Sequence, residues 1–518
     1  MIDKINILWV DDEIDLLKPH ILFLNHKGYD VSTANNGSDA IDVLKTKPFD
    51  IIFLDENMPG LSGIETLTIL KEQYPNLPVV MITKSEEESI MEDAIGSNIT
   101  DYLIKPVNPN QILLSLKKSL ENKKIIREKT TYAYQQEFQN IGMEITNNLD
   151  HAEWVEVYRK LVSWELKLEK SEDEGIQEVL RLQKAEANQV FSRFIEKNYL
   201  GWVNGSNRNR PSLSHTIFKE KLFPYLEGNQ PVFLLLIDNL RFDQWKIIQP
   251  VIEEFFRTDS EDLFYSILPS TTQYSRNALF SGLMPSEIEK KYPRWWVNEG
   301  DEGTKNQFEG ELLGEWLKRF GKDIKSSYNK VLNLAAGRKL VESLPNLLVN
   351  KLNVIVYNFV DMLSHARTEM EIIKELADDE PAYRSLTLSW FIHSPLLEII
   401  RMLADKKVTV IITTDHGSVK VQNPVKIIGD KNTTANLRYK TGRSLDFNSK
   451  EVFEVRNPED AFLPRGGVSS SFVFCRRNDF FAYPNNFNYY ANYYRNTFQH
   501  GGISLEELII PFVVLKNK

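Results

Sequence analysis

The chain has 518 residues, of which 42% are hydrophobic and 26% are charged. This composition is typical of a globular protein, and the length predicts two to four domains. The formal net charge of −10 argues against binding to duplex DNA, whose affinity depends mainly on neutralised phosphates. A single cysteine excludes a disulfide framework and favours a cytoplasmic location. The sequence shows neither a signal peptide nor a bilayer-spanning apolar run, so we expect no membrane insertion.

Residues 1–122 alternate between strand-like and helix-like runs, which predicts a doubly wound (βα)5 domain around a parallel sheet. The five predicted strands are INILWV (5–10), DVSTAN (30–35), FDIIFL (49–54), PVVMIT (78–83) and DYLIK (101–105). A helical run, DLLKPHILFLNHKG, follows the first strand and ends at Gly28.

Residues 123–220 have a different pattern, because apolar residues such as Trp154, Val157 and Leu161 recur at helical spacing. We therefore predict a small helical bundle, followed by a polar loop at 204–214. Residues 221–518 return to an α/β pattern, with a polar stretch at 420–470 that we interpret as an insertion over one face. The predicted strands of this region are VFLLLID (232–238), LFYSIL (263–268), NVIVYNFVD (353–361), VTVIITTD (408–415), SFVFCR (471–476) and IIPFVVL (509–515).

Polar side chains end or directly follow four of the five strands predicted in the first region. They are Asp11, Asp12, Asp55, Thr83 and Lys105. The carboxyl ends of parallel strands meet at one crevice, so these side chains should lie together. Carboxylates suit Mg²⁺, and an aspartate beside the ion can act as a nucleophile toward a phosphoryl group. Helix N-caps would explain one or two of these residues, but not five in this order.

The motifs DDE, LDENMPG, the threonine after PVVMI, and DYLIKPV resemble the receiver domain of two-component response regulators. The resemblance implies a sensor histidine kinase as partner and Asp55 as the phospho-acceptor. It also implies that Asp12, Asp55 and the carbonyl of Asn57 bind Mg²⁺, with Asp11 beside them.

Three further residues take roles from the same resemblance. Thr83 and Lys105 would bind the phosphoryl oxygens. Tyr102 lies where the family has an aromatic side chain that switches rotamer, although a half-buried strand aromatic explains it equally well.

A second group of acidic and imidazole side chains falls at strand ends in the third region. It consists of Asp238, Asp361, His365, Asp415, His416 and His500. Because His365 follows Asp361 by four residues, the two should share a helix face. We place His500 on a flexible loop. Three aspartates and three histidines are what a two-zinc site requires, and two such ions can clamp the oxygens of a displacement at phosphorus. Taken singly, each residue also has a simpler reading as a cap, a helical pair or a loop histidine.

A candidate nucleophile lies in LPSTTQYSRNALFSG (268–282), which is predicted as a loop entering a helix. Thr271 or Thr272 would lie at the helix N-terminus, where backbone N–H groups favour a phosphate anion. An N-cap threonine is the simpler alternative for either residue.

The motifs PSTTQYSR, NFVDMLSH, TTDHG and QHGG resemble the PglZ-type branch of the alkaline phosphatase superfamily over about residues 221–518. The resemblance implies one Zn²⁺ on Asp361, His365 and His500. It implies a second on Asp238, Asp415 and His416. Thr272 would be the nucleophile and a zinc ligand, with Thr271 as the alternative. Arg276 either contacts the phosphate or is an ion-pair arginine.

A receiver joined through helices to a PglZ-type domain resembles the PorX-type regulators of type IX secretion. This resemblance implies contacts with a type IX secretion motor component and a sigma factor, and the chain lacks a DNA-binding output motif. We predict a phosphorylation-promoted homodimer whose output is hydrolysis of a phosphodiester, either an oligonucleotide or a cyclic nucleotide. Aromatic residues in YPRWW (292–296) and NFNYYANYY (486–494) can stack on bases, although aromatic side chains more often pack in cores. The alternative is a catalytically silent zinc domain that binds a protein or senses a ligand.

Overall fold

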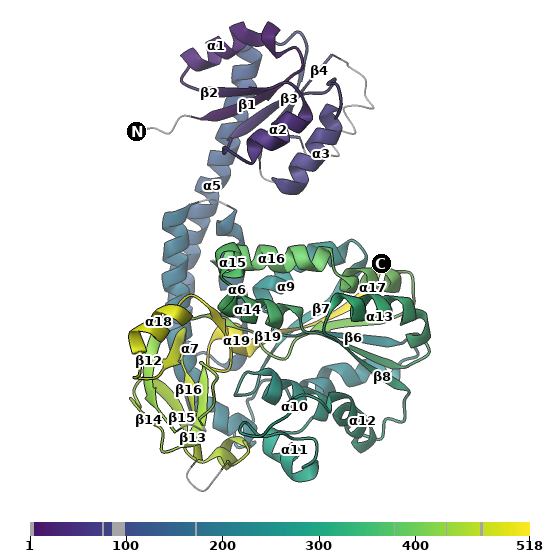
Figure 1. The fold of residues 1–518 in the computed structure, drawn as a ribbon, viewed down its shortest axis with the longest axis vertical. Coiled ribbons are helices and arrows are strands. Elements are labelled where there is room, and N and C mark those ends of the chain that lie inside the picture. Colours follow the sequence, from purple (N-terminus) through teal and green to yellow (C-terminus); the bar gives the residue numbers. More distant parts are fainter. Residues whose placement is uncertain are drawn as a thin grey trace. The chain divides into compact units, whose positions relative to one another are not determined.

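The structure is a computed structural model that describes residues 5–74, 77–84, 99–170, 173–377, 379–430, 433–466 and 470–518. The chain forms two compact units. Unit 1 comprises residues 1–136 and 170–173, and unit 2 comprises residues 137–169 and 174–518 (Figure 1). Each unit is described by itself.

Unit 1 contains a five-stranded parallel sheet in the order β2-β1-β3-β4-β5. The strands are β1 (Asn6–Val10), β2 (Asp30–Ala34), β3 (Ile51–Asp55), β4 (Val79–Thr83) and β5 (Asp101–Ile104). The predicted α/β receiver fold is confirmed. The apolar runs of β3 and β4 are buried along their whole length, as expected for strands covered on both faces.

Helices cover both faces of this sheet. They are η1 (Ile14–Leu17), α1 (Lys18–His26), α2 (Gly37–Leu44), α3 (Gly63–Gln73) and the first part of α5 (Pro109–Thr146). Side chains of α2 and α3 pack on the face that carries Leu8 and Leu54, whereas α1 and α5 pack on the face that carries Trp9 and Phe53. Each fully buried side chain of this size stabilises the fold by roughly 1.5–3 kcal/mol.

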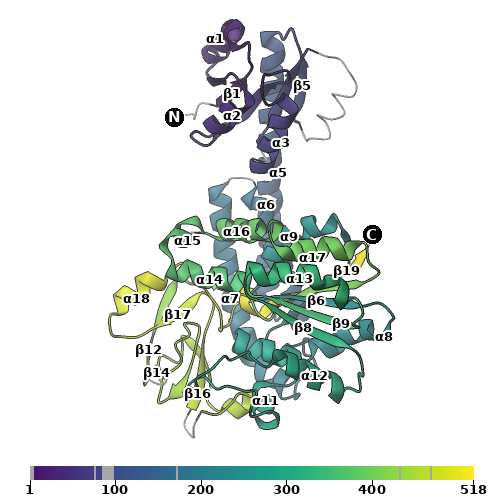
Figure 2. The same cartoon turned by 45° about the vertical axis from the view of Figure 1, so that its right-hand side comes forward.

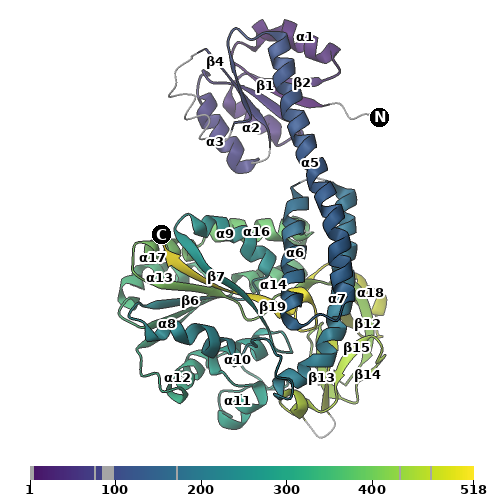
Figure 3. The same cartoon turned by 180° about the vertical axis from the view of Figure 1, so that it is seen from behind.

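The helical region predicted between the two α/β regions is present. It consists of the rest of α5, α6 (His151–Glu169) and α7 (Glu174–Val203), and Figure 3 shows α6 beside α7. α5 is continuous through residue 122, where the sequence suggested a boundary, because no helix-breaking residue occurs there. Trp154, Val157 and Leu161 are buried on one face of α6, and residues 206–212 form an irregular loop after α7.

The main sheet of unit 2 has the strand order β7-β19-β10-β6-β9-β8. Figure 2 shows its strands β6, β8, β9 and β19. Its strands are β6 (Val232–Ile237), β7 (Phe256–Tyr265), β8 (Ser326–Val331), β9 (Leu352–Tyr357), β10 (Thr409–Thr413) and β19 (Ile509–Asn517). β10, β6, β9 and β8 are parallel, and β19 runs antiparallel to both of its neighbours. The sequence reading missed β8, whose residues SSYNKV are polar and half exposed.

Helices lie on both faces of the main sheet (Figure 1). On one side lie α9 (Phe242–Glu253), α13 (Leu334–Leu347), α16 (Glu380–Ile392) and α17 (Pro395–Ala404). On the other side lie α10 (Asn277–Ser281), α11 (Pro285–Lys291) and α12 (Glu309–Arg319). The remaining helical segments are η2 (Phe218–Leu222), α8 (Phe223–Glu227), η3 (Thr272–Arg276), α14 (Phe359–Glu369), α15 (Glu371–Leu376) and α19 (Leu505–Leu508).

The predicted polar insertion lies within residues 419–499, which form three small sheets. They pair β11 (Val419–Lys420) with β18 (Phe498–Gln499), β12 (Asn423–Ile428) with β14 (Asp446–Phe447) and β17 (Asp479–Ala482), and β16 (Ser470–Cys475) with β13 (Tyr439–Arg443) and β15 (Val452–Val455). η4 (Pro458–Ala461) and α18 (Phe487–Tyr494) accompany these strands. Buried side chains such as Ile427, Val473 and Phe481 give this region its own core. In the described part of the chain, no helix has the length and apolarity needed to cross a membrane.

Candidate metal and phosphoryl sites

The carboxyl ends of three parallel strands of unit 2 carry the acidic residues that the sequence singled out. Asp238 directly follows β6, and Asp415 and His416 come after β10. Asp361 differs from the sequence expectation, which continued the strand as far as this residue. β9 ends at Tyr357 and α14 begins at Phe359, so Asp361 lies in the first turn of a helix.

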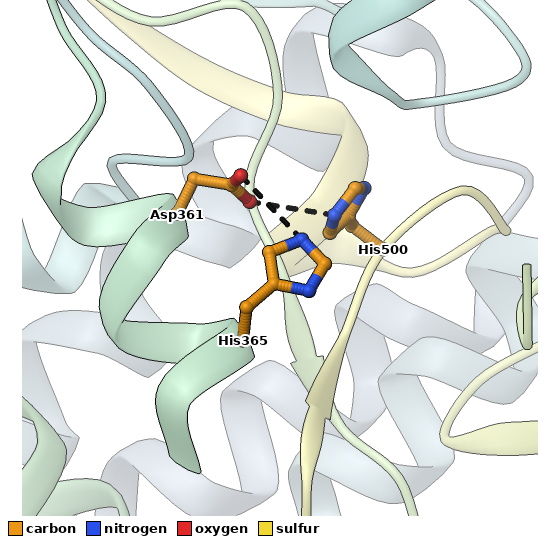
Figure 4. A group of neighbouring side chains, drawn as sticks. All are labelled: Asp361, His365 and His500. Carbon is orange, nitrogen blue, oxygen red and sulfur yellow. Dashed lines mark ion pairs between the residues drawn. The ribbon is translucent and has the colours of Figure 1, made fainter. Parts of the chain in front are cut away.

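The first triad consists of Asp361, His365 and His500 (Figure 4). Asp361 and His365 share a face of α14, and their Oδ2 and Nε2 atoms are 3.5 Å apart. His500 comes from the segment after β18, and its Nε2 lies 3.4 Å from Asp361 Oδ1. The His365 side chain is 58% exposed, so this triad opens toward solvent.

The second triad, Asp238, Asp415 and His416, is fully buried. His416 Nε2 lies 3.6 Å from Asp238 Oδ1 and 3.8 Å from Asp415 Oδ2. Within the described residues, Asp415 Oδ2 is buried without a hydrogen-bond partner. A buried carboxylate oxygen in this state is costly unless a cation binds it.

The two triads lie next to each other. The rings of His416 and His500 stack with their centroids 4.3 Å apart. Asn239 bridges the triads, because its backbone N–H donates to Asp415 at 3.4 Å and its side-chain amide donates to Asp361 at 3.3 Å. The six residues therefore form one site built from separate strands and loops.

The donor set and its spacing fit zinc. Two ligands bound at about 2.0–2.2 Å to one tetrahedral Zn²⁺ lie roughly 3.3–3.6 Å apart. Three of the four distances between the imidazole and carboxylate donors are 3.4–3.6 Å, and the fourth is 3.8 Å. Nitrogen and oxygen donors in equal numbers suit zinc better than a hard cation such as Mg²⁺.

The electrostatics of the site also favour the binding of cations. Burial raises the pKa of Asp238 well above its usual value, against the opposing effect of Arg276. Burial raises the pKa of Asp361 as well, but the contact with His500 outweighs it and holds that pKa below its usual range. Burial lowers the pKa of His416 to about 4. Burial also lowers the pKa of His500, yet Asp361 raises it overall. His416 therefore presents a neutral imidazole at pH 7, which is the form that binds a metal.

Thr272 is the first residue of η3, and its hydroxyl faces the buried triad. Its Oγ1 lies 3.1 Å from His416 Nε2 and donates to Asp238 Oδ1 at 3.3 Å. Thr271 is the N-cap residue, and in the described part of the chain its buried hydroxyl has no hydrogen-bond partner. The sequence left both threonines open, whereas the geometry directs only Thr272 to the candidate metal ligands.

Arg276 lies one turn after Thr272 and is buried between carboxylates. Its Nη1 donates to Asp238 Oδ2 at 2.6 Å and its Nε donates to Glu309 Oε1 at 2.5 Å. Glu309 also accepts hydrogen bonds from Lys330 Nζ, at 3.1 Å, and from the Tyr328 hydroxyl. Of the two roles left open for Arg276, the structure places it in ion pairs. The sequence analysis missed Glu309, because a single glutamate at a helix start carries no distinguishing pattern.

Gly417 follows the buried triad and cannot be replaced without moving the backbone. A Cβ atom built at this position would lie 2.0 Å from the carbonyl oxygen of Glu506. The backbone N–H of Gly417 donates to the carbonyl of Glu507 at 3.2 Å. The loop that carries Asp415 and His416 therefore packs closely against the backbone of α19.

The receiver site gathers Asp11, Asp12 and Asp55 at the carboxyl ends of β1 and β3. Lys105 Nζ lies 2.8 Å from Asp11 Oδ2 and 2.7 Å from Asp55 Oδ1. Burial raises the pKa of Asp55, while the hydrogen bond from Lys105 opposes this effect. Asp12 is exposed, which leaves an open side with oxygen donors of the kind that Mg²⁺ prefers.

The other predicted receiver residues surround this group. Thr83 ends β4 and is buried, and its hydroxyl donates to Glu56, a partner that the sequence reading did not identify. Tyr102 is half buried and packs against the receiver core. Asn57 is exposed two residues after Asp55.

The two aromatic segments differ in exposure. Trp296 is buried, and Tyr292 stacks on Trp295 with centroids 4.9 Å apart. On α18, Tyr489 is 63% exposed and stacks on Tyr493. Packing therefore accounts for Trp296, whereas α18 presents rings to solvent.

The fold and the acidic site of unit 1 define a response-regulator receiver domain, and three family profiles match successive parts of the chain. The response regulator receiver domain matches residues 7–117, and the PorX response regulator linker domain matches residues 124–203. The BREX system PglZ alkaline phosphatase-like domain matches residues 217–515, which is more than half of the chain. The chain therefore belongs to the PglZ alkaline phosphatase-like family, with the PorX-type arrangement of a receiver followed by a linker and a PglZ domain.

Curated relatives match a smaller part of the chain. It is 31% identical over 140 residues to the transcriptional regulatory protein ZraR of Klebsiella oxytoca, which covers 27% of this chain and 32% of that protein. It is 36% identical over 115 residues to the alginate biosynthesis transcriptional regulatory protein AlgB of Pseudomonas putida, which covers 22% and 26%. The chain thus spans about a third or less of the length of these relatives.

Solved structures also match a part of the chain. The chain is 29% identical to the chemotaxis protein CheY4 of Vibrio cholerae, covering 23% of this chain and 99% of that one, with a TM-score of 0.22. It is 31% identical to the receiver domain of NtrX from Brucella abortus, covering 22% of this chain and 98% of that one, also with a TM-score of 0.22.

Proposed function

We propose that this protein is a two-component response regulator whose output is a zinc-dependent phosphodiesterase controlled by Asp55. One observation carries the proposal. Two adjacent Asp/His triads lie at strand ends, and the hydroxyl of Thr272 lies within hydrogen-bonding distance of two residues of one triad. A nucleophile beside six metal-type ligands is an arrangement that supports phosphoryl transfer through a covalent intermediate.

Each group of residues has a defined part in this reaction. Zinc bound at the triads would supply Lewis-acid stabilisation of negative charge at the attacking and leaving oxygens. Thr272 Oγ1 gives its proton to solvent water and forms a bond to phosphorus, while the bond between phosphorus and the leaving oxygen breaks and that oxygen takes up a proton from water. Water then hydrolyses the phosphothreonine and releases the product. The contacts of Thr272 Oγ1 with Asp238 and His416 place the threonine oxygen beside the donor atoms that would bind the ion.

The charge beside the nucleophile supports a diester as substrate. The arginine one turn after Thr272 is engaged by Asp238 and Glu309. A monoester carries about one more negative charge than a diester and requires more cationic compensation. A short oligonucleotide or a cyclic nucleotide is the proposed substrate class, and the exposed rings of α18 are candidates for contacts with its bases.

The decisive experiment compares Thr272→Ala with Thr271→Ala on a chromogenic diester and on the matching monoester. We expect Thr272→Ala to lose turnover, because the nucleophile is gone. Thr271→Ala should keep most of it, because that hydroxyl contacts none of the six ligands. Undiminished activity in Thr272→Ala would remove the residue from this role. Equal wild-type rates on the two substrates would remove the diester preference.

The receiver side of the proposal concerns control. A sensor histidine kinase would phosphorylate Asp55, with Mg²⁺ bound at Asp12 and Asp55, and the added charge would draw Thr83 and Lys105 toward the phosphoryl group. We propose that this change promotes a homodimer and contacts with a type IX secretion motor component and a sigma factor. Light scattering with and without beryllofluoride tests the first step, and an unchanged mass at micromolar protein would contradict it.

One observation favours a second candidate, a zinc domain without turnover. All three residues of the Asp238 triad are fully buried, and structural zinc sites are closed in this way. In this case output would be protein or ligand binding alone. Turnover of any phosphoester that is lost on chelation and restored by zinc would exclude this candidate.

A further inference from the structure

Helix α7 contacts the loop that leads to the proposed nucleophile. The backbone N–H of Leu268 donates a hydrogen bond of 2.8 Å to the hydroxyl oxygen of Tyr199, and both residues are buried. Leu268 lies four residues before Thr272. The Tyr199 hydroxyl therefore fixes the point at which the chain leaves β7 and turns toward η3.

The same helix contacts the segment behind the buried triad. Asn188 accepts a hydrogen bond from the backbone N–H of Leu505 at 2.8 Å and donates one to Glu506 Oε2 at 3.0 Å. These residues begin α19, against which Gly417 is packed. α7 therefore reaches both segments that flank the site, through residues more than 60 positions away in sequence.

The nucleophile loop also connects to the loop that carries His500. The Ser270 hydroxyl donates to the carbonyl of Gly502 at 3.0 Å and accepts from the backbone N–H of Gly501 at 3.2 Å. Ser270 lies between the anchored Leu268 and Thr272. A shift of the backbone at Leu268 would therefore change two things together, the position of the threonine hydroxyl and the loop of the first triad.

From these contacts we infer that Tyr199 is a positioning residue for Thr272. Helix α7 therefore supports the geometry of the catalytic centre and is not only a spacer. This inference rests on the proposed phosphodiesterase function. Tyr199 touches neither substrate nor metal ligands and acts only through the backbone of residues 268–272. Because a displacement of about 1 Å at a reacting group can lower a rate by on the order of 100-fold, one such hydrogen bond is sufficient to matter.

The chain provides a matched control for the test. The hydroxyl of Tyr265 is also buried and also joins the helical region to the main sheet, because it donates to the carbonyl of His151 at 2.8 Å. Tyr199→Phe and Tyr265→Phe therefore remove the same chemical group and one hydrogen bond each, which is buried for Tyr199 and partly buried for Tyr265. Only the first of these bonds holds the nucleophile loop.

The experiment measures kcat and KM on a chromogenic diester, bound zinc, and thermal midpoint for the full-length protein and both variants. We expect Tyr199→Phe to lower kcat by about ten-fold or more while KM and zinc content stay within two-fold of wild type. Both variants should lower the thermal midpoint by similar amounts, because each loses one hydrogen bond. Tyr265→Phe should nevertheless leave kcat within two-fold of wild type. A general loss of stability would not produce this split.

The outcomes separate the inference from the proposed function. Wild-type protein without turnover would reject the proposed function, and the inference with it. Wild-type turnover with an unchanged kcat in Tyr199→Phe, or an equal fall in Tyr265→Phe, would overturn the inference alone. If Tyr199→Phe does not fold, Asn188→Ala tests the other contact of α7, with a similar expected fall in kcat at constant KM, and an unchanged kcat there would overturn the part of the inference that concerns α7.

Discussion

The two units hold a basic side chain at their acidic sites in different ways. Each places aspartates at the carboxyl ends of parallel strands and brings one basic side chain to them. In the receiver this side chain is Lys105, which contacts Asp11 and Asp55 and remains 14% exposed. In the PglZ unit it is Arg276, which is 1% exposed and is held on its far side by Glu309.

The difference suggests what each site is built to do. A lysine has a flexible stem and a point charge, so it can turn from a carboxylate to an incoming phosphoryl group, whereas an arginine in a fixed fork cannot. The receiver offers oxygen donors and an exposed Asp12, which suits a metal and a phosphoryl group that come and go. The PglZ site offers imidazoles and buried carboxylates, which suits resident zinc.

Removal of metal should have the largest effect on activity and stability. It should also show that the proposed metal sites of the PglZ unit and of the receiver respond differently. We expect chelation with EDTA to abolish diester turnover and to lower the unfolding temperature of the PglZ unit. A ligand present at 100 times its Kd stabilises the folded state by about 2.7 kcal/mol, and this stabilisation is lost with it. Magnesium withdrawal should stop phosphorylation of the receiver with little change in its unfolding temperature.

Calorimetry with and without each metal checks this contrast. His365→Ala is the matched variant, because it removes an exposed ligand and should lose one zinc per chain without unfolding the protein. If EDTA leaves both turnover and unfolding unchanged, the PglZ site does not hold a resident metal.

The fixed position of Arg276 predicts the next largest effect. Glu309→Gln weakens the hold on the guanidinium, which orients the proposed ligand Asp238, so zinc affinity or turnover should fall by about 10–100-fold. Lys330→Met is the control, because Lys330 also contacts Glu309 but lies away from the ligands. Zinc titration and steady-state kinetics measure both variants, and equal effects would mean that Glu309 does not act through Arg276.

In the receiver, Glu56 predicts a smaller change. Its carboxylate accepts the hydrogen bond from Thr83 and adds negative charge near Asp55, the proposed phospho-acceptor. At a separation of about 4 Å, two unit charges interact with an energy of about 1 kcal/mol in water. Glu56→Gln should therefore speed phosphorylation by acetyl phosphate about five-fold. Glu72→Gln, at an exposed position of α3, should not change the rate. A slower Glu56→Gln would show that the carboxylate assists the reaction.

The smallest effect concerns pH. Burial raises the pKa of Asp55, so the folded receiver holds this proton more tightly than the unfolded chain does. Stability from this group is present below the usual pKa of an aspartate and is lost as the pH rises through the raised value. Asp55→Asn should therefore raise the thermal midpoint of the magnesium-free receiver at pH 7, and the gain should vanish near pH 3. A gain independent of pH would point to packing instead.

The sequence was informative wherever a pattern is local. Buried apolar runs that end in aspartate located β1, β3, β6 and β10, and hence the positions of both sites. The spacing of Asp361 and His365 correctly indicated a shared helix face, although the preceding strand ends earlier than expected.

Features that depend on tertiary contacts could not be predicted from the sequence. Adjacent threonines differ only in where their hydroxyls point, and that direction is set by the turn into η3. Glu309, Glu56 and Tyr199 act on partners 33, 27 and 69 positions away, so no periodicity marks them. The sequence did not predict β8, because its side chains are mostly polar, as is possible for a strand at the edge of the sheet.

The position of β19 has a consequence for biosynthesis. Residues 509–517 form an interior strand between β10 and β7, not an edge. While the ribosome is still making this segment, β10 presents an unpaired apolar flank and β7 has no neighbour in the sheet. Such long-range pairing slows folding, and open flanks of this kind invite aggregation. A nascent chain that already contains both triads must therefore wait for β19 before β10 and β7 are joined in one sheet.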